Sequence, residues 1–159
     1  MRQVRTSVFE TNSSMTHSIV MCPTAGYEDW LEGKSLFNEW KRPQFVSVEE
    51  GRKFNADILR KWWDGTIVRK DEADDNYLYF DDEDEEEVLE SFNEENIAKY
   101  EQGEFSLVDF YLDKYTVMEN LYYDYDFWND NVCEYYETFS EEYEDGDVKV
   151  TAFGYYGHD

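Results

Sequence analysis

The residues best placed to do chemistry are seven consecutive acids and the acids that follow them at helical spacing. On an α-helix, residues four apart lie about 6 Å from each other, because each residue advances the helix by about 1.5 Å. Glu86, Glu90 and Glu94 would then repeat at roughly the spacing of phosphates along one nucleic-acid strand, and could occupy a cationic groove built for nucleic acid. This candidate partner-binding site consists of Asp81, Asp82, Glu83, Asp84, Glu85, Glu86, Glu87, Glu90, Glu94 and Glu95.

A solvated helix face with an acidic loop is the simpler interpretation of such a run. Solubility alone does not need so much charge, however, and the self-repulsion of like charges opposes folding. Aromatic side chains are interleaved with acids from Tyr122 to Asp130, and could supply the buried anchors that carry affinity at an interface.

The stretch Asn12-Ser13-Ser14-Met15-Thr16-His17 is the most enzyme-like part of the sequence. A serine beside a histidine can be a nucleophile with its base, and hydroxyls and amides in a polar loop can hold a phosphate. No Gly-x-Ser-x-Gly elbow or Walker lysine accompanies these residues. The loop from Thr11 to His17, with Asn12, Ser13, Ser14 and His17 as its candidate residues, is therefore the alternative site. Hydroxyls bonded to their own backbone would make it an ordinary loop.

Metal and cofactor sites are not expected. The acidic stretches 71–87 and 124–134 lack the glycine that an EF-hand loop needs at its sixth position. The thiols and imidazoles, which include no Cys-x-x-Cys pair, are those of Cys22, Cys133, His17 and His158. Two cysteines are too few for a disulfide framework, which fits a reducing cytoplasm.

The net charge of −25 arises almost wholly after residue 70. Residues 1–70 carry 11 basic and 9 acidic side chains, whereas residues 71–159 carry 3 and 30. This balance disfavours direct contact with nucleic acid or anionic membranes, since both require cations on the protein. A basic patch is the rival candidate for binding single-stranded nucleic acid. The simpler interpretation is a cationic surface that the acidic half partly neutralises. The patch consists of Trp62 and Trp63 and the basic residues around them: Arg52, Lys53, Arg60, Lys61, Arg69 and Lys70.

The sequence pattern predicts the elements that must position these residues. They are expected to form an α+β fold in a single domain, 1–159, with mostly antiparallel short strands, two or three helices and an anionic face. The 30 aromatic residues, 19% of the chain, are expected to supply most of its core. Strands are predicted at 2–9, 18–21, 66–68 and 77–80, with a hairpin of 136–143 and 148–156 around Asp145-Gly146. Helices are predicted at 27–31, 48–63 and 84–101, and from 116 to about 125. The helix 48–63 begins at the capping-box spacing of Ser47 and Glu50, and its apolar positions Phe54, Ile58 and Trp62 recur every four residues. No apolar run is long enough to span a membrane, and the first residues lack the apolar stretch of a signal peptide.

Both ends of the chain have a distinctive motif. The first is Phe9-Glu10-Thr11-Asn12-Ser13-Ser14-Met15-Thr16-His17-Ser18, and the second is Ala152-Phe153-Gly154-Tyr155-Tyr156-Gly157. They resemble the opening and the ending of one group of small proteins from Gram-positive bacteria and their phages. The opening of that group commonly reads Phe-Glu-Thr-Asn-Ser-Ser-Ser-x-His-Ser, and Met15 stands here in place of the third serine. The resemblance implies a phage-related context, and no catalytic residue is carried over from it. In size and charge the chain looks like the acidic anti-CRISPR and anti-restriction inhibitors of phages.

The sequence therefore predicts a non-enzymatic, cytoplasmic, phage-type inhibitor that mimics nucleic acid and blocks the cationic groove of a host defence enzyme. A CRISPR effector is the most specific candidate partner, because such proteins hold a heteroduplex in a positively charged channel. The alternatives are a small enzyme or nucleotide-binding protein using the Thr11–His17 loop, and a scaffold or self-associating protein.

Overall fold

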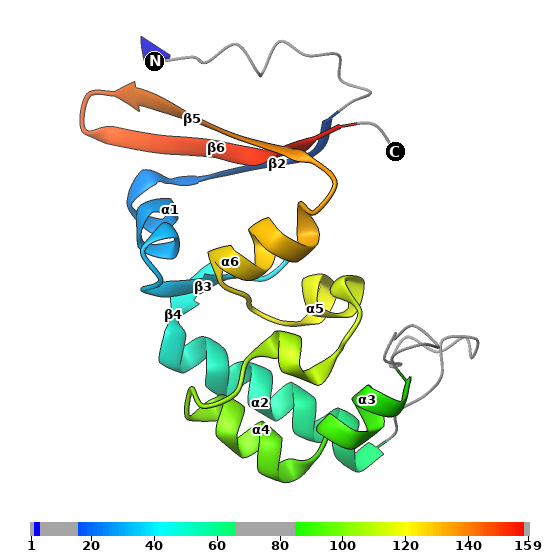
Figure 1. Cartoon of the computed structure of the whole chain (residues 1–159). Coiled ribbons are helices and arrows are strands. Elements are labelled where there is room, and N and C mark those ends of the chain that lie inside the picture. Colours follow the sequence, from blue (N-terminus) through cyan, green and yellow to red (C-terminus); the bar gives the residue numbers. More distant parts are fainter. Residues whose placement is uncertain (1, 4–15, 66–84, 158–159) are drawn as a thin grey trace. The chain divides into compact units, whose positions relative to one another are not determined.

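The computed structural model describes residues 2–3, 16–65 and 85–157, which form an α+β fold with mostly antiparallel strands, as predicted (Figure 1). The chain divides into two compact units. The boundaries between them do not coincide with residue 70, where the charge of the sequence changes. Unit 1 comprises residues 1–35 and 125–159, and unit 2 comprises residues 36–124. The helices outnumber the two or three that were expected.

Unit 1 is built on an antiparallel sheet of strand order β1-β5-β6-β2. Its strands are β1 (Arg2–Gln3), β2 (Thr16–Pro23), β5 (Glu137–Asp145) and β6 (Val148–Tyr156). Strands β5 and β6 form the predicted hairpin, with Asp145 opposite Val148 across a two-residue loop. Gly146 has φ 60° at the first loop position, which glycine adopts without strain. The predicted strand 18–21 is thus the middle of a longer strand, and that at 2–9 is described only at β1.

Aromatic side chains fill the core of unit 1, as the composition predicted. Helix α1 (Thr24–Leu31) presents the fully buried Trp30 to Phe153 of β6, with the ring centroids 5.3 Å apart. The short helix α6 (Tyr125–Phe127) and the π-helical turn η5 (Trp128–Val132) complete the cluster. The rings of Tyr125 and Trp128 lie 5.2 and 5.5 Å from that of Trp30, both edge-on. Such edge-on contacts add to the stabilisation that burial provides.

Unit 2 consists of a two-stranded sheet and a set of helices. The sheet pairs β3 (Ser35–Phe37) with β4 (Phe45–Ser47), and helix α2 (Val48–Gly65) follows at once. The hydroxyl of Ser47 accepts a hydrogen bond from the backbone N–H of Glu50 at 3.2 Å, so the predicted cap does start this helix. The remaining elements are α3 (Glu85–Ser91), α4 (Glu94–Glu101), the 3-10 helix η4 (Leu107–Phe110) and α5 (Lys114–Asn120). Figure 1 shows α2 and α4 side by side, and residues of the two helices are in contact.

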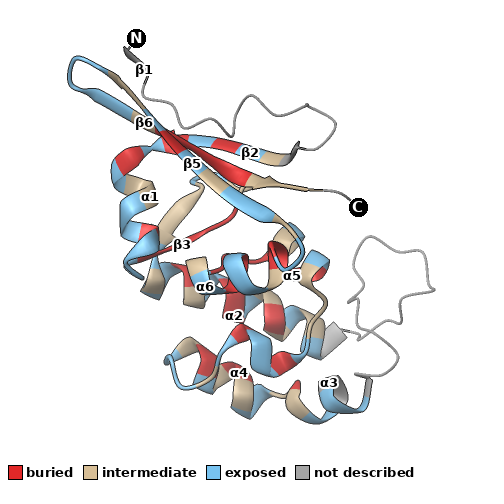
Figure 2. Ribbon diagram, turned by 45° about the horizontal axis from the view of Figure 1, so that its top comes forward, coloured by how far each residue is buried: buried red, intermediate tan, exposed pale blue. Residues whose placement is uncertain are grey.

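The buried side of α2 differs from the predicted stripe of Phe54, Ile58 and Trp62. Phe54 is exposed, and Ile58 and Trp62 are half-buried, whereas Asn55, Ala56 and Leu59 are wholly buried (Figure 2). The amide of Asn55 is the reason: its Nδ2 donates to the hydroxyl of Tyr100 and the carbonyl of Tyr122, both at 2.7 Å, and its Oδ1 accepts from the backbone N–H of Tyr122 at 2.9 Å. The face of α2 that packs against the rest of unit 2 is therefore the one with Asn55.

A second buried asparagine, Asn38, holds the neighbouring part of the chain. Its Nδ2 donates to the carbonyls of Met118 and Leu121, at 2.8 and 2.7 Å. The predicted helix from 116 to about 125 differs at both ends, because α5 begins at Lys114 and ends at Asn120. The next three residues are buried and extended instead, since the two asparagines take up backbone groups that a helix would use.

The predicted helix 84–101 is also wrong as one element, because it consists of two helices, α3 and α4. The break lies at Asn93, which has an extended backbone (φ −150°, ψ 166°) and accepts a hydrogen bond from the N–H of Asn96 at 2.9 Å. Asparagine is a preferred N-cap residue. Phe92, just before it, is fully buried and fixes the turn between the helices. The predicted strands 66–68 and 77–80 lie outside the described residues.

Candidate functional site

The described part of the predicted acidic site lies on α3 and at the start of α4. The side chains of Glu86, Glu87 and Glu90 on α3 are exposed, as are those of Glu94 and Glu95 on α4. Asp81, Asp82, Glu83 and Asp84 lie outside the described residues, and Glu85 is described only as the first residue of α3. The exposed carboxylates of α3 are thus the end of the acidic run, Glu86 and Glu87, and Glu90 one turn later.

The regular row of Glu86, Glu90 and Glu94 is not formed as predicted. Glu86 and Glu90 share one helix, but Glu94 begins the next helix, after the break at Asn93. The four-residue spacing therefore applies to the first pair alone. Carboxylates in the first turn of α4 also stabilise that helix, because they lie near the positive end of its dipole.

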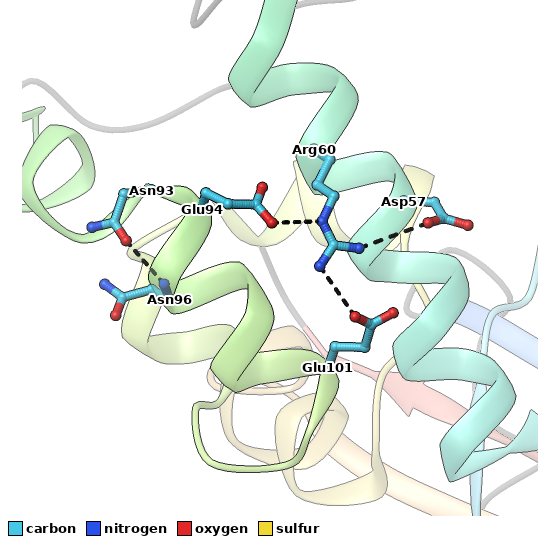
Figure 3. A network of polar contacts seen from close by, with 6 residues as sticks. All are labelled: Asp57, Arg60, Asn93, Glu94, Asn96 and Glu101. Atoms are coloured by element: carbon cyan, nitrogen blue, oxygen red, sulfur yellow. Dashed lines mark hydrogen bonds and ion pairs between the residues drawn. The ribbon is translucent and has the colours of Figure 1, made fainter.

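Glu94 takes part in an ion-pair network between α2 and α4 (Figure 3). The guanidinium of Arg60 lies 3.1 Å from Glu101 and 3.0 Å from Glu94, and 3.9 Å from Asp57 on its own helix. The hydrogen bonds to Glu101 and then Glu94 raise the pKa of Arg60, because they favour its charged form. Part of the negative charge assigned to the site is therefore neutralised within the protein.

Glu95 is paired as well, with Lys99 one turn later on α4, at 3.3 Å. In contrast, Glu86, Glu87 and Glu90 form no ion pair with any residue that the structure describes. The name "α3 acids" is used below for these three residues. They are the exposed carboxylates of the predicted site whose charge is not balanced within the described chain.

Replacing Arg60 by methionine is expected to lower the free energy of unfolding by about 1 kcal/mol, because exposed ion pairs contribute little and this network is only partly buried. The apolar stem of methionine keeps the packing of the arginine chain. Chemical denaturation monitored by fluorescence measures the change. Lys61→Met is the matched control, since Lys61 is exposed and forms no ion pair with a described residue. Equal losses in the two variants would contradict a role for the network.

The rival cationic patch is directed partly inward. Arg52 donates to the backbone carbonyl of Tyr100 at 2.9 Å, and its guanidinium lies 5.4 Å from the centre of the Tyr100 ring. Arg60 is occupied by the acids described above. Lys53 and Lys61 are exposed, while Arg69 and Lys70 lie outside the described residues. Of the tryptophans, Trp62 is half-buried and Trp63 is 43% exposed with its ring 6.4 Å from that of Phe92.

The alternative site is described only at its end. Asn12, Ser13 and Ser14 lie outside the described residues, and His17, predicted in a loop, belongs to strand β2. Its position is irregular: Thr16 faces Tyr156 and Ser18 faces Tyr155, so His17 is one residue more than β6 provides.

The two cysteines are buried. Burial raises the pKa of the Cys22 thiol to about 11, which keeps it protonated near neutral pH. Across the described ranges, no three His, Cys, Asp or Glu side chains gather in a way that could hold a metal ion. In the same ranges, no helix combines the length and the apolar character needed to cross a bilayer.

One surface turn is not among the elements predicted from the sequence. Helix η4 begins with a capping box, in which the carboxylate of Asp109 accepts from the N–H and the hydroxyl of Ser106, at 3.0 and 2.9 Å. The spacing Ser106-x-x-Asp109 is the sequence signal for such a start. Nothing in the sequence indicates that Tyr111, just after it, has a left-handed backbone with φ 56°.

Comparisons of the chain with protein-family models, with curated proteins and with solved structures found no match.

Proposed function

We propose that the chain is a phage-type inhibitor that acts in the cytoplasm by occupying the cationic nucleic-acid-binding groove of a host defence enzyme, most specifically a CRISPR effector. The α3 acids and the acidic run before them would stand in for phosphates. The inhibitor would need no catalytic residue and no cofactor, because occupying the groove is enough to exclude nucleic acid.

The observation that carries this proposal is the exposure of the three α3 acids without a balancing cation among the described residues. The neighbouring Glu94 and Glu95 do have basic partners in the fold. Carboxylates that stabilise the fold are expected to have basic partners, as Glu94 and Glu95 do. The α3 acids add electrostatic repulsion instead, and a cationic partner would relieve that repulsion.

The sequence context adds to this argument. Helix α3 directly follows Asp81 to Asp84, so four further acids precede it in the sequence. A concentrated anionic surface also accelerates association with a cationic groove, and the acceleration falls with ionic strength. Inhibition that weakens with salt is therefore a property of the proposed mechanism.

The test neutralises the α3 acids with Glu86→Gln, Glu87→Gln and Glu90→Gln in one variant. We expect it to bind an RNA-guided DNA nuclease, loaded with its guide RNA, at least about tenfold more weakly than the unchanged protein, because paired charges across an interface are lost. Binding is measured at low and high salt, together with cleavage of a target duplex. The unchanged protein should inhibit cleavage, and excess duplex should relieve the inhibition.

The matched control changes the net charge equally, with Glu28→Gln, Asp29→Asn and Glu32→Gln in unit 1. All three side chains are exposed, and the first two lie on α1. The control variant should bind within about twofold of the unchanged protein if position matters beyond net charge. The proposal is overturned if the unchanged protein neither binds nor inhibits the nuclease, or if both variants lose affinity equally.

A further inference from the structure

Tyr111 has an unusual backbone for its residue type. Its φ of 56° lies in the left-handed region, and it is the one non-glycine residue with positive φ in the part of the chain that the structure describes. For an L-residue with a Cβ this conformation costs about 1–2 kcal/mol. Its side chain is 48% exposed, so burial of the ring does not offset that cost. Strain of this kind persists where the surroundings impose it, and it often accompanies binding sites.

The neighbouring residues impose this conformation. Phe110, just before it, is fully buried, with its ring 4.7 Å from that of Phe105 and 5.8 Å from that of Phe92. The capping box at Ser106 fixes the start of the same turn. After it, the carboxylate of Asp113 accepts from the N–H of Tyr115 at 3.0 Å and starts α5. The direction of the chain must therefore change in the few residues between η4 and α5, where the side chain of Phe110 is buried and that of Tyr111 is exposed.

Val108 is an exposed apolar residue of helix η4, just before Tyr111 in the chain. It is 50% exposed, and its carbonyl accepts a hydrogen bond from the N–H of Tyr111 at 3.2 Å. The turn thus has two exposed apolar side chains and is closed by a backbone hydrogen bond. A tyrosine held rigid before binding loses little conformational entropy when a partner covers it.

The sequence around this turn is acidic. Between residues 101 and 119 the chain has five carboxylates and one lysine, and of the carboxylates Glu101 is paired with Arg60. That lysine, Lys114, has its ammonium 5.3 Å from the centre of the Tyr115 ring. Helix η4 is also in contact with α3, so the turn and the α3 acids belong to neighbouring elements of unit 2. A complementary partner surface is therefore basic, and the face of a tyrosine ring attracts guanidinium or ammonium groups.

We infer that Tyr111, supported by Val108, is the aromatic anchor of this inhibitor and receives an arginine or lysine side chain of the cationic target. This inference rests on the proposed function and adds a residue that directly follows η4, a helix in contact with α3. The acids attract and orient the target, while the anchor slows its release, since buried tyrosines carry much of the affinity at interfaces.

Tyr111→Gly and Tyr111→Asn test the anchor without harming the fold, because both residues accept a positive φ. We expect thermal stability to stay equal or rise, and affinity for the guide-loaded nuclease to fall about 10- to 30-fold, mainly through faster dissociation. Tyr111→Phe keeps the ring and should bind within about threefold of the unchanged protein. Kinetic binding measurements and thermal melts provide both readouts.

Trp40→Ala is the matched control. Trp40 is 72% exposed, more than Tyr111, but Lys41 and Arg42 follow it directly, so a cationic target should avoid it. The inference is overturned if Tyr111→Gly binds as tightly as the unchanged protein, or if Trp40→Ala loses as much affinity as Tyr111→Gly. In both cases nucleic-acid mimicry stands as long as the α3 acids are needed. If the unchanged protein does not bind the nuclease, the proposed function fails and this inference fails with it.

Discussion

Replacing Asn55 by leucine is expected to lower the free energy of unfolding by about 3–5 kcal/mol. The substitution leaves three buried groups without their partner: the backbone N–H and C=O of Tyr122 and the hydroxyl of Tyr100. Each buried group that loses its hydrogen bond costs about 1–3 kcal/mol. Leucine has the same number and branching of side-chain heavy atoms as asparagine, so lost polar pairing accounts for most of the change.

The hydroxyl of Tyr100 shows how closely this site is enclosed. Burial raises the pKa of Tyr100 to about 12, although the hydrogen bond from Asn55 and the charge of Arg52 act in the opposite direction. The phenol therefore remains neutral at physiological pH and accepts a hydrogen bond from the amide of Asn55. Removing the amide leaves this oxygen in a place where water cannot easily replace it.

Denaturant unfolding of Asn55→Leu measures the loss directly, with Lys53→Leu as the control. Lys53 lies two residues earlier on the same helix and is exposed, so its replacement should change stability by less than about 0.5 kcal/mol. Tyr100→Phe removes one of the three hydrogen bonds and should cost about 1 kcal/mol. A loss at Asn55 no larger than that of Tyr100→Phe would contradict the double anchoring of Tyr122.

The elements that were predicted correctly have signals within a few residues of one another. Ser47 and Glu50 predicted the start of α2, and Asp145-Gly146 between alternating strands predicted the β5–β6 hairpin. The α+β class followed from these elements. In each case the hydrogen bonds concerned join residues close in sequence, so their residue types are enough to indicate the structure.

The incorrect predictions share a different cause. The stretch 84–101 has helix-forming residues throughout, and only the capping preference of Asn93 could have indicated its division into two helices. The burial of Asn55 depends on Tyr122, 67 residues away, and the pairing of Glu94 depends on Arg60, 34 residues away. A sequence pattern contains no information on such partners. The exposed α3 acids were predicted by charge alone, whereas the turn at Tyr111 became visible only in the structure.

Replacing Gly154 by alanine is expected to lower the free energy of unfolding by about 3 kcal/mol or more, at the upper end of the cost of overpacking. A Cβ at this position of β6 would lie 1.9 Å from the carbonyl oxygen of Ser18 and 2.8 Å from its carbonyl carbon. These are backbone atoms of β2, which cannot rotate away as a side chain can. The strands would have to separate where β2 carries its extra residue, His17.

Gly146→Ala is the matched control in the same hairpin. No atom lies within 4 Å of a Cβ there, so its cost of about 1–2 kcal/mol comes from the positive φ alone. Comparable losses at the two glycines would contradict the close approach of β6 to Ser18. A larger loss at Gly154 would show that the pairing of β6 with the backbone of β2 at Ser18 needs a residue without a side chain.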